Sequence, residues 1–152
     1  MKTKTNNDPG KELCITKMLD APIELVWEVW TNPEHIANWW APAGFTNTIH
    51  TMNVTEGGEW RLTINGPDGK NYPNKSIFGE IVQQKKIVFQ HYNPNYLATI
   101  VFEPHEKKTF MEWTMGFETT ELFDTVVRVF KADEGLKQSV EKLSAYLETQ
   151  LK

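Results

Sequence analysis

The sequence predicts an α+β fold in which a curved antiparallel sheet of about seven strands wraps around one long C-terminal helix. Between residues 45 and 118, apolar side chains alternate with a period of two, and Gly- and Pro-containing turns separate the segments. Residues 133–151 instead carry apolar side chains at helical spacing. One strand and two short helices precede the alternating region. One helix must then bury its apolar stripe against one face of the sheet.

The expected strands are short and joined by recognisable turns. Glu56-Gly57-Gly58 and Gly66-Pro67-Asp68-Gly69 are typical of hairpin turns, because Gly relieves strain and Pro fixes φ. The segment 119–131 is compatible with strand or helix. The strands are expected at 12–18, 45–54, 59–65, 75–82, 87–92, 97–103 and 109–118.

Three helices are predicted from caps and spacing. Pro22 opens the first helix, and Asn32-Pro33 opens the second, which ends near Trp39. The buried face of the first helix is expected to hold Ile23, Val26, Trp27 and Trp30. The final helix, 133–151, is expected to face the sheet with Leu136, Val140, Leu143 and Leu147.

Length and composition limit the classes of protein. The 152 residues suggest one domain at 12–152 behind a loose tail at 1–11. A net charge of −4 and the absence of a Lys/Arg run argue against a nucleic-acid partner. No apolar run reaches the roughly 20 residues of a membrane span. Cys14 is the single cysteine, which excludes an internal disulfide and favours a cytoplasmic setting. We expect a monomer or a homodimer.

The adjacent pair Trp39-Trp40 stands between the second helix and a Pro/Gly break. Such a pair either fills a core or shapes the mouth of a cavity. Side chains of neighbouring helical residues point about 100° apart. We therefore expect one of the two to contribute to a cavity rim, and Trp60 on its alternating strand to point inward. A ligand entering there is expected to change tryptophan emission.

The order and spacing of several motifs resemble the START-like (SRPBCC, helix-grip) superfamily. The similarity is greatest to the branch related to the C-terminal domain of the heat-shock-protein-90 ATPase activator, and it covers residues 12–151. The motifs are Ala21-Pro22 with Trp27 and Trp30; Pro33-Glu34-His35 with Trp39-Trp40; Pro42; Gly44-Phe45; Gly57-Gly58-Glu59-Trp60; Gly66-Pro67-Asp68-Gly69 with Tyr72-Pro73; Glu80-Ile81; Ile87-Val88-Phe89; and Glu134-Gly135-Leu136 leading into Val140, Leu143 and Tyr146-Leu147. Two departures are the turn 82–86, which lacks the usual prolines and acidic residue, and Leu136, where tryptophan is common in this branch.

The resemblance implies a cavity between the last helix and the sheet. We expect it to bind a small hydrophobic or lipid-like ligand, with no cofactor and no metal. Met and aromatic side chains on the inward strand faces suit either an adaptable pocket or a plain core. The expected ligand-binding residues are Trp39, Trp40, His50, Met52, Trp60, Leu62, Glu80, Phe89, His91, Ile100, Phe102, Met111, Trp113, Met115, Leu136, Val140 and Leu143.

Candidate catalytic groups are few. By alternation His50 shares a face with Met52, and His91 with Phe89, so each could orient a ligand or act as an acid or base, or could be structural. Glu80 could lie on a partly apolar face with a raised pKa, or pair with a cationic side chain across the strands. His35 is expected to be exposed. The sequence contains no zinc-ligand spacing, nucleophile elbow or phosphate-binding loop.

Two other functions remain as alternatives. The superfamily that the chain resembles includes cyclases, dehydratases and hydrolases that act on polyketide-like or aromatic substrates. Such an enzyme would need two or more ionisable groups that face one ligand. The branch also suggests a module that regulates a chaperone ATPase. We expect no counterpart of the activator's N-terminal chaperone-binding domain in these 152 residues, which disfavours that role.

Overall fold

The computed structural model describes residues 12–41, 43–92, 95–128 and 131–151. The predicted order of elements is confirmed, and the segment left open between strand and helix contains helix α3. The elements are β1 (Glu12–Leu19), α1 (Ile23–Thr31), α2 (Pro33–Trp39), β2 (Thr46–Met52), β3 (Glu59–Asn65), β4 (Asn71–Val82), β5 (Lys86–Tyr92), β6 (Tyr96–His105), β7 (Lys108–Phe117), α3 (Thr120–Arg128) and α4 (Ala132–Gln150).

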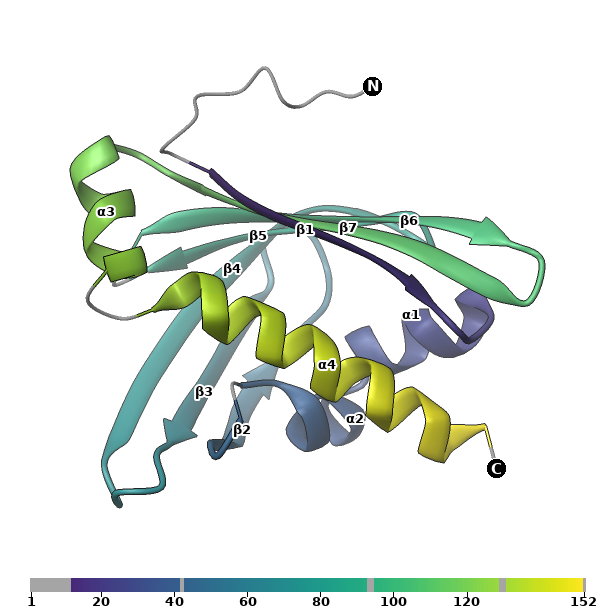
Figure 1. Ribbon diagram of the computed structural model, residues 1–152, viewed down its shortest axis with the longest axis horizontal. Helices are drawn as coiled ribbons and strands as arrows, with labels where there is room; N and C mark the ends of the chain where they lie inside the picture. Colours follow the sequence, from purple (N-terminus) through teal and green to yellow (C-terminus); the bar gives the residue numbers. More distant parts are fainter. Residues whose placement is uncertain (1–11, 42, 93–94, 129–130, 152) are drawn as a thin grey trace.

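The seven strands form one antiparallel sheet in the order β1-β7-β6-β5-β4-β3-β2. Strands β2 to β7 pair with their chain neighbours, and β1 pairs with β7. The sheet curves around α4, which lies across its concave face (Figure 1). The predicted stripe of α4 is buried, so it faces the sheet. None of the described helices is both long and apolar enough to cross a membrane.

Helices α1 and α2 pack beside α4 near its C-terminal end (Figure 1). Asn32 caps α2, because its side-chain oxygen accepts a hydrogen bond from the Glu34 backbone N–H at 2.9 Å. The buried face of α1 differs from the prediction in one position. Val29 is fully buried, whereas Trp27 is only partly buried. Trp27 lies at the edge of this face, where its ring contacts Phe102 edge-on.

Two irregular strands overturn two predictions of side-chain direction. The register of β2 shifts between Ile49 and Thr51, so His50 does not share a face with Met52 and is exposed instead. The register of β4 shifts between Phe78 and Ile81, and Glu80 is likewise exposed. An extra residue in one strand reverses the alternation beyond it. The carboxylate of Glu80 is 2.8 Å from the Lys86 ammonium group, which is the cross-strand pairing considered for it.

The β2–β3 connection requires glycine at a specific position. Gly57 adopts a left-handed φ of +84°, which favours glycine. Gly58 is buried, and a Cβ atom there would collide with the backbone carbonyl of Asn53. The connection leads into β3, on which Trp60 is buried in the core.

Candidate ligand-binding cavity

A cavity of about 220 Å³, partly open to solvent, lies between the N-terminal half of α4 and the concave face of the sheet. It is lined by parts of the chain that are distant in sequence: the end of α2, strands β3, β4, β6 and β7, and α4. Most of its wall is apolar, with a few polar side chains. The lining residues are Trp40, Ala41, Ile64, Asn74, Tyr96, Trp113, Met115, Lys131, Ala132, Gly135, Leu136 and Ser139.

Two tryptophans form an aromatic wall of the cavity. The rings of Trp40 and Trp113 are stacked, with centroids 5.4 Å apart and planes 20° apart. Trp39, adjacent to Trp40 in the chain, instead is fully buried, and its Nε1–H donates to the Val29 carbonyl at 3.0 Å. One member of the pair therefore fills the core and the other lines the cavity. This is the division that helical geometry predicts for adjacent residues.

The indole N–H of Trp113 has no hydrogen-bond partner among the described residues, although the residue is only 4% exposed. Trp30 and Trp60 have the same unpartnered N–H, but neither lines the cavity. A buried donor without a partner costs about 1–3 kcal/mol, so such a group calls for an explanation. Trp113 differs from the other two because other atoms of the residue border the cavity, whereas its Nε1 is itself covered.

A polar group lies at the sheet side of the cavity. The His91 Nε2 is 2.6 Å from the Asn74 Oδ1, and the imidazole stacks on the Tyr96 ring at 4.5 Å. Burial raises the pKa of Tyr96 far above its ordinary value, because the phenolate would be poorly solvated. Tyr96 therefore presents a neutral hydroxyl near neutral pH. His91 holds Asn74 and Tyr96, which themselves line the cavity.

Helix α4 forms the opposite wall through its first two turns. Ala132, Gly135, Leu136 and Ser139 line the cavity at helical spacing. Lys131 precedes the helix in a left-handed conformation, with φ 55°, and also lines the cavity. No side chain caps this helix end among the described residues. The small residues Ala132, Gly135 and Ser139 leave the space that larger side chains would fill.

The structure divides the expected ligand-binding residues into three groups. Trp40, Trp113, Met115 and Leu136 line the cavity. Two lie elsewhere on the surface: His50 and Glu80. The remaining residues lie in or against the packed core: Trp39, Met52, Trp60, Leu62, Phe89, His91, Ile100, Phe102, Met111, Val140 and Leu143.

Several lining residues were missed by the sequence reasoning, although signals for three of them exist. Tyr96 continues the alternation of Ala98 and Ile100, but the strand was expected to start one residue later. Ile64 continues the inward face of β3. Ser139 lies one helical turn after Leu136. Asn74 carries no comparable signal, because it stands beside Pro73 in a polar stretch.

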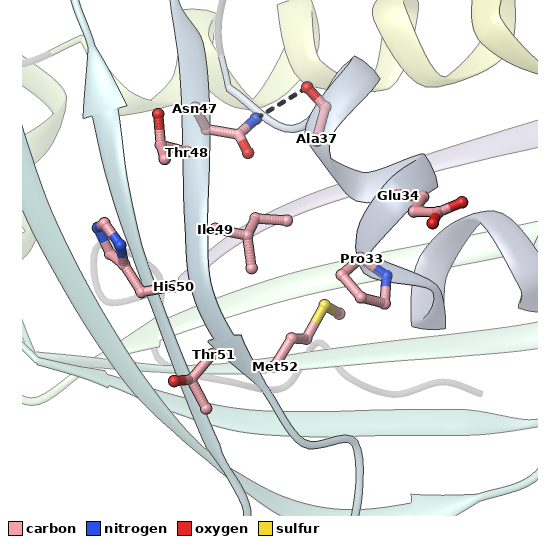
Figure 2. A pocket seen from close by; sticks show the side chains of 9 residues that line it. All are labelled: Pro33, Glu34, Ala37, Asn47, Thr48, Ile49, His50, Thr51 and Met52. Carbon is pink, nitrogen blue, oxygen red and sulfur yellow. Dashed lines mark hydrogen bonds between the residues drawn. The ribbon is translucent and has the colours of Figure 1, made fainter.

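A second hollow is a groove of about 480 Å³ between α2 and the edge strand β2. Figure 2 shows Ile49 and Met52 pointing toward α2, and His50 pointing away from it. His50 Nε2 is 2.8 Å from the Thr63 hydroxyl on the neighbouring strand. The Asn47 amide closes one end of the groove by donating to the carbonyls of Ala37 and Trp40. The groove is separate from the cavity below α4.

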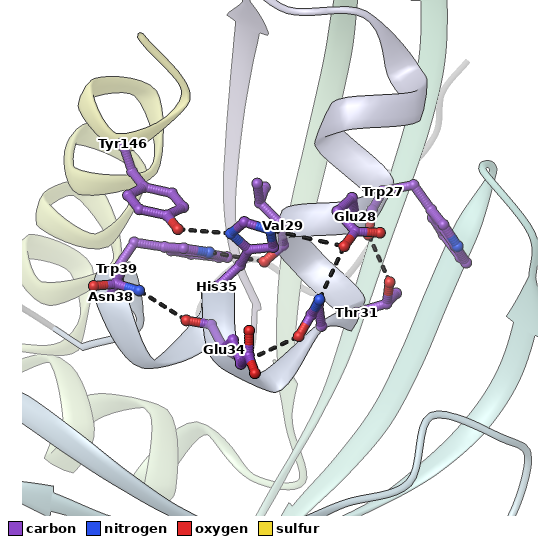
Figure 3. Close-up of polar contacts among 10 residues, drawn as sticks. Trp27, Glu28, Val29, Thr31, Glu34, His35, Asn38, Trp39 and Tyr146 are labelled. Carbon is purple, nitrogen blue, oxygen red and sulfur yellow. Dashed lines mark hydrogen bonds and ion pairs between the residues drawn. The ribbon is translucent and has the colours of Figure 1, made fainter. Parts of the chain in front are cut away.

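The C-terminal half of α4 makes polar contacts to α2, and α2 in turn contacts α1 (Figure 3). The His35 Nδ1 is 2.6 Å from the Tyr146 hydroxyl, and its Nε2 is 3.7 Å from the Glu28 carboxylate. His35 is therefore partly buried, and the expectation that it is exposed is wrong. Burial raises the pKa of Tyr146, while a hydrogen bond to Asn38 opposes that rise.

A metal centre finds no support in the described residues. Among them, no group of three or more His, Cys, Asp or Glu side chains is arranged to hold a metal ion. The cysteine Cys14 is exposed on β1. The donor set of the cavity is indole, phenol, amide, hydroxyl and ammonium, which suits an organic ligand.

The family of the chain is decided by its similarity to a known sequence model. Residues 20–148 match the model described as "Activator of Hsp90 ATPase homolog 1-like protein". The chain belongs to this family. The match covers α1 to α3, strands β2 to β7 and α4 up to residue 148, and therefore includes every residue that lines the cavity. No curated protein matches the chain in sequence.

Solved structures similar to this family member share its helix-grip fold. A protein from Nitrosomonas europaea has a TM-score of 0.86 at 21% identity, over 95% of this chain and 98% of that one. A protein from Arthrobacter aurescens has a TM-score of 0.86 at 24% identity, over 92% and 87%. An AHSA1-like protein from Aeromonas hydrophila has a TM-score of 0.77 at 18% identity, over 91% and 93%. At these identities the likeness concerns the fold.

Proposed function

We propose that this protein binds a small hydrophobic molecule in the cavity between α4 and the sheet. The observation that carries the proposal is the cavity itself, about 220 Å³ of space with an aromatic and aliphatic wall. An engineered apolar cavity of about 150 Å³ binds benzene. The pockets that bind drug-sized ligands have volumes of about 300–1,000 Å³. The size therefore favours a ligand of one or two fused rings over a long acyl chain.

Hydrophobic burial supplies most of the affinity in this proposal. Trp40, Trp113, Met115, Ile64 and Leu136 offer aromatic and aliphatic surface. Each Å² of apolar surface removed from water contributes about 25 cal/mol before ordering costs. Methionine adapts its shape to a ligand, whereas the stacked indoles provide a flat surface.

Binding fits the cavity better than catalysis does. A cyclase or hydrolase requires ionisable groups that exchange protons with the substrate. Among the described lining residues, the ionisable ones are Tyr96 and Lys131. The raised pKa of Tyr96 makes its phenolate a rare species near neutral pH. The Tyr96 hydroxyl therefore suits orientation of a ligand by a hydrogen bond.

The proposal is tested by filling the cavity. Ser139 is 7% exposed and lines the cavity, so Ser139→Leu places a larger apolar side chain there. We expect 2-methylnaphthalene to bind the unaltered protein and to bind Ser139→Leu at least about tenfold more weakly, a loss of about 1.4 kcal/mol. Isothermal titration calorimetry measures both affinities.

The matched control makes the same chemical change on the same helix. Ser144 lies on α4 outside the cavity lining. Ser144→Leu is expected to bind 2-methylnaphthalene like the unaltered protein. Circular dichroism checks that both variants fold. Equal binding by folded Ser139→Leu and Ser144→Leu would show that the ligand binds elsewhere and would refute the proposed site.

A further inference from the structure

We infer that the ligand of this cavity is a neutral aromatic compound with a carbonyl group, of which an aryl ketone is the simplest example, and that the hydroxyl groups of Tyr96 and Ser139 select it by hydrogen bonds. This inference rests on the proposed function and specifies the chemical class of the ligand. It is carried by two hydroxyl groups of the lining residues that have no described partner and that protein atoms leave uncovered.

The two hydroxyl groups belong to opposite walls of the cavity. Tyr96 begins strand β6 on the sheet side, and Ser139 lies in the second turn of α4. Neither hydroxyl has a hydrogen-bond partner among the described residues, and, unlike the indole nitrogen of Trp113, neither oxygen is fully covered by protein atoms. A plain hydrocarbon that displaced water from both would leave two polar groups unpaired, which is unfavourable.

Neighbouring side chains hold Tyr96 in position. The His91 imidazole stacks on its ring at 4.5 Å with the planes 13° apart, and the Phe117 ring lies 5.6 Å away. The polar side chain next to it on the sheet side, Asn74, is already engaged, because its Oδ1 is 2.6 Å from His91 Nε2 and its amide donates to the Tyr72 carbonyl at 2.9 Å. Tyr96 is therefore a positioned donor that loses little freedom when a ligand binds.

A carbonyl oxygen is the ligand atom that suits both hydroxyl groups. It has two lone pairs and no proton, so it accepts a hydrogen bond from each of two donors. Burial raises the pKa of Tyr96, so its hydroxyl keeps the proton that it donates near neutral pH. The stacked rings of Trp40 and Trp113 supply the flat surface for the aromatic part of the ligand.

The charge of the wall favours a neutral ligand. Among the described lining residues, Lys131 alone carries a charge at neutral pH, and it is exposed. An ionised carboxylate that entered the cavity would lose its hydration while the Lys131 ammonium group stayed in water, and two hydroxyl groups replace only part of that hydration. A carbonyl group has less hydration to lose, so the same two hydroxyl groups satisfy it.

Three ligands of similar shape separate the carbonyl group from burial and from charge. They are the ketone 2-acetylnaphthalene, 2-isopropenylnaphthalene, in which a methylene group replaces the ketone oxygen, and 2-naphthoate, which is ionised at neutral pH. Calorimetry of the full chain compares the unaltered protein with Tyr96→Phe and Ser139→Ala. Each variant is expected to weaken the ketone at least about fivefold and to change 2-isopropenylnaphthalene by less than about twofold. The unaltered protein is expected to bind 2-naphthoate more weakly than the ketone.

Two matched controls make the same chemical changes outside the cavity lining. They are Tyr92→Phe and Ser144→Ala, and both are expected to bind the three compounds like the unaltered protein. Circular dichroism checks that all four variants fold. The infrared carbonyl band of bound 2-acetylnaphthalene gives a second measurement, since hydrogen bonds lower its frequency. In the unaltered protein the band is expected below its position in a hydrocarbon solvent, and each of the two cavity variants is expected to raise it.

The outcomes distinguish this inference from the proposed function. Equal changes for the ketone and 2-isopropenylnaphthalene in either Tyr96→Phe or Ser139→Ala overturn recognition by the two hydroxyl groups, while binding of 2-methylnaphthalene still supports the cavity. Tighter binding of 2-naphthoate than of the ketone, or a bound carbonyl band at its hydrocarbon-solvent position, also overturns it. Failure of all these compounds to bind, 2-methylnaphthalene included, overturns the proposed function together with the inference.

Discussion

The two halves of α4 lie against the same sheet but differ in what fills the space beneath them. At the C-terminal half, Leu143 and Leu147 are almost fully buried, and Tyr146 contacts His35 at 2.6 Å. At the N-terminal half, Gly135 and Ser139 stand where bulky residues would complete the core, and a cavity of about 220 Å³ remains. Packing at one end fixes the helix, so the other end can border a cavity without loss of the fold.

The largest expected effect compares the two halves directly. Leu143→Ala removes a fully buried side chain and should lower the free energy of unfolding by roughly 2–5 kcal/mol, near the upper part of that range. Leu136→Ala should cost less, because part of the Leu136 surface already borders a cavity. Urea denaturation of both variants measures the difference. Equal losses would mean that the cavity end is packed as tightly as the other end.

The next effect concerns Tyr96 at the cavity end. Burial raises its folded-state pKa, so above pH ~10 the unfolded chain releases the phenol proton while the folded chain keeps it. The contribution of the protonated Tyr96 phenol to the free energy of unfolding is complete below the pKa of Tyr96 in the unfolded chain. It is lost as the pH rises through the pKa of Tyr96 in the folded protein. Above pH ~10 the free energy of unfolding should therefore fall more steeply with pH in the unaltered protein than in Tyr96→Phe. The two slopes should differ by up to about 1.4 kcal/mol per pH unit. Tyr92→Phe, on an exposed residue, is the control and should keep the slope of the unaltered protein.

A smaller effect is expected at the packed end. Tyr146→Phe removes the hydroxyl that contacts His35 and should lower the free energy of unfolding by about 0.5–1.5 kcal/mol. The measurement is again urea denaturation at neutral pH, with Tyr92→Phe as the variant that should change little. Ligand affinity should stay unchanged in Tyr146→Phe, since Tyr146 does not line the cavity. Weaker binding in this variant would show that the two halves of α4 are coupled.

The smallest expected effect is a change in the NMR chemical shifts of the tryptophan indole N–H groups when a ligand binds. When 2-methylnaphthalene binds, the indole N–H resonances of Trp40 and Trp113 should shift more than those of Trp39 and Trp60, because the first two line the cavity. Ring currents of the ligand cause the shift. Spectra of Trp40→Phe and Trp113→Phe assign the two peaks. A larger shift at Trp39 or Trp60 would place the ligand deeper in the core.

The fold was predictable from the sequence because its signals are local. Periods of two and 3.6 residues, together with Asn32 as a cap and Gly57 in a turn, gave the elements and their order. The face of the sheet to which a strand side chain points was less predictable where a β-bulge occurs. The register shifts beside His50 and Glu80 leave no mark in the alternation pattern, and each turned a candidate site residue outward.

The cavity lining was only partly predictable, for a geometric reason. Trp40, Trp113, Met115 and Leu136 combine large apolar side chains with the correct spacing, so sequence reasoning selected them. Curvature of the sheet decides which inward-facing residues border open space and which fill the core, and curvature is a property of all strands together. Thus Phe89 and Ile100 have the same pattern as Trp113 but are packed.

The irregular edge strand β2 also affects how the protein behaves among other chains. An open sheet has two outer strands whose free backbone groups can pair with a strand of another molecule, which is a route to aggregation. On β2, the register shift interrupts the regular backbone, and α2 is tied to the strand by the Asn47 amide. A strand arriving there would meet a bent template with a helix beside it. Intermolecular pairing is thereby disfavoured at this edge, which leaves β1 as the more regular of the two.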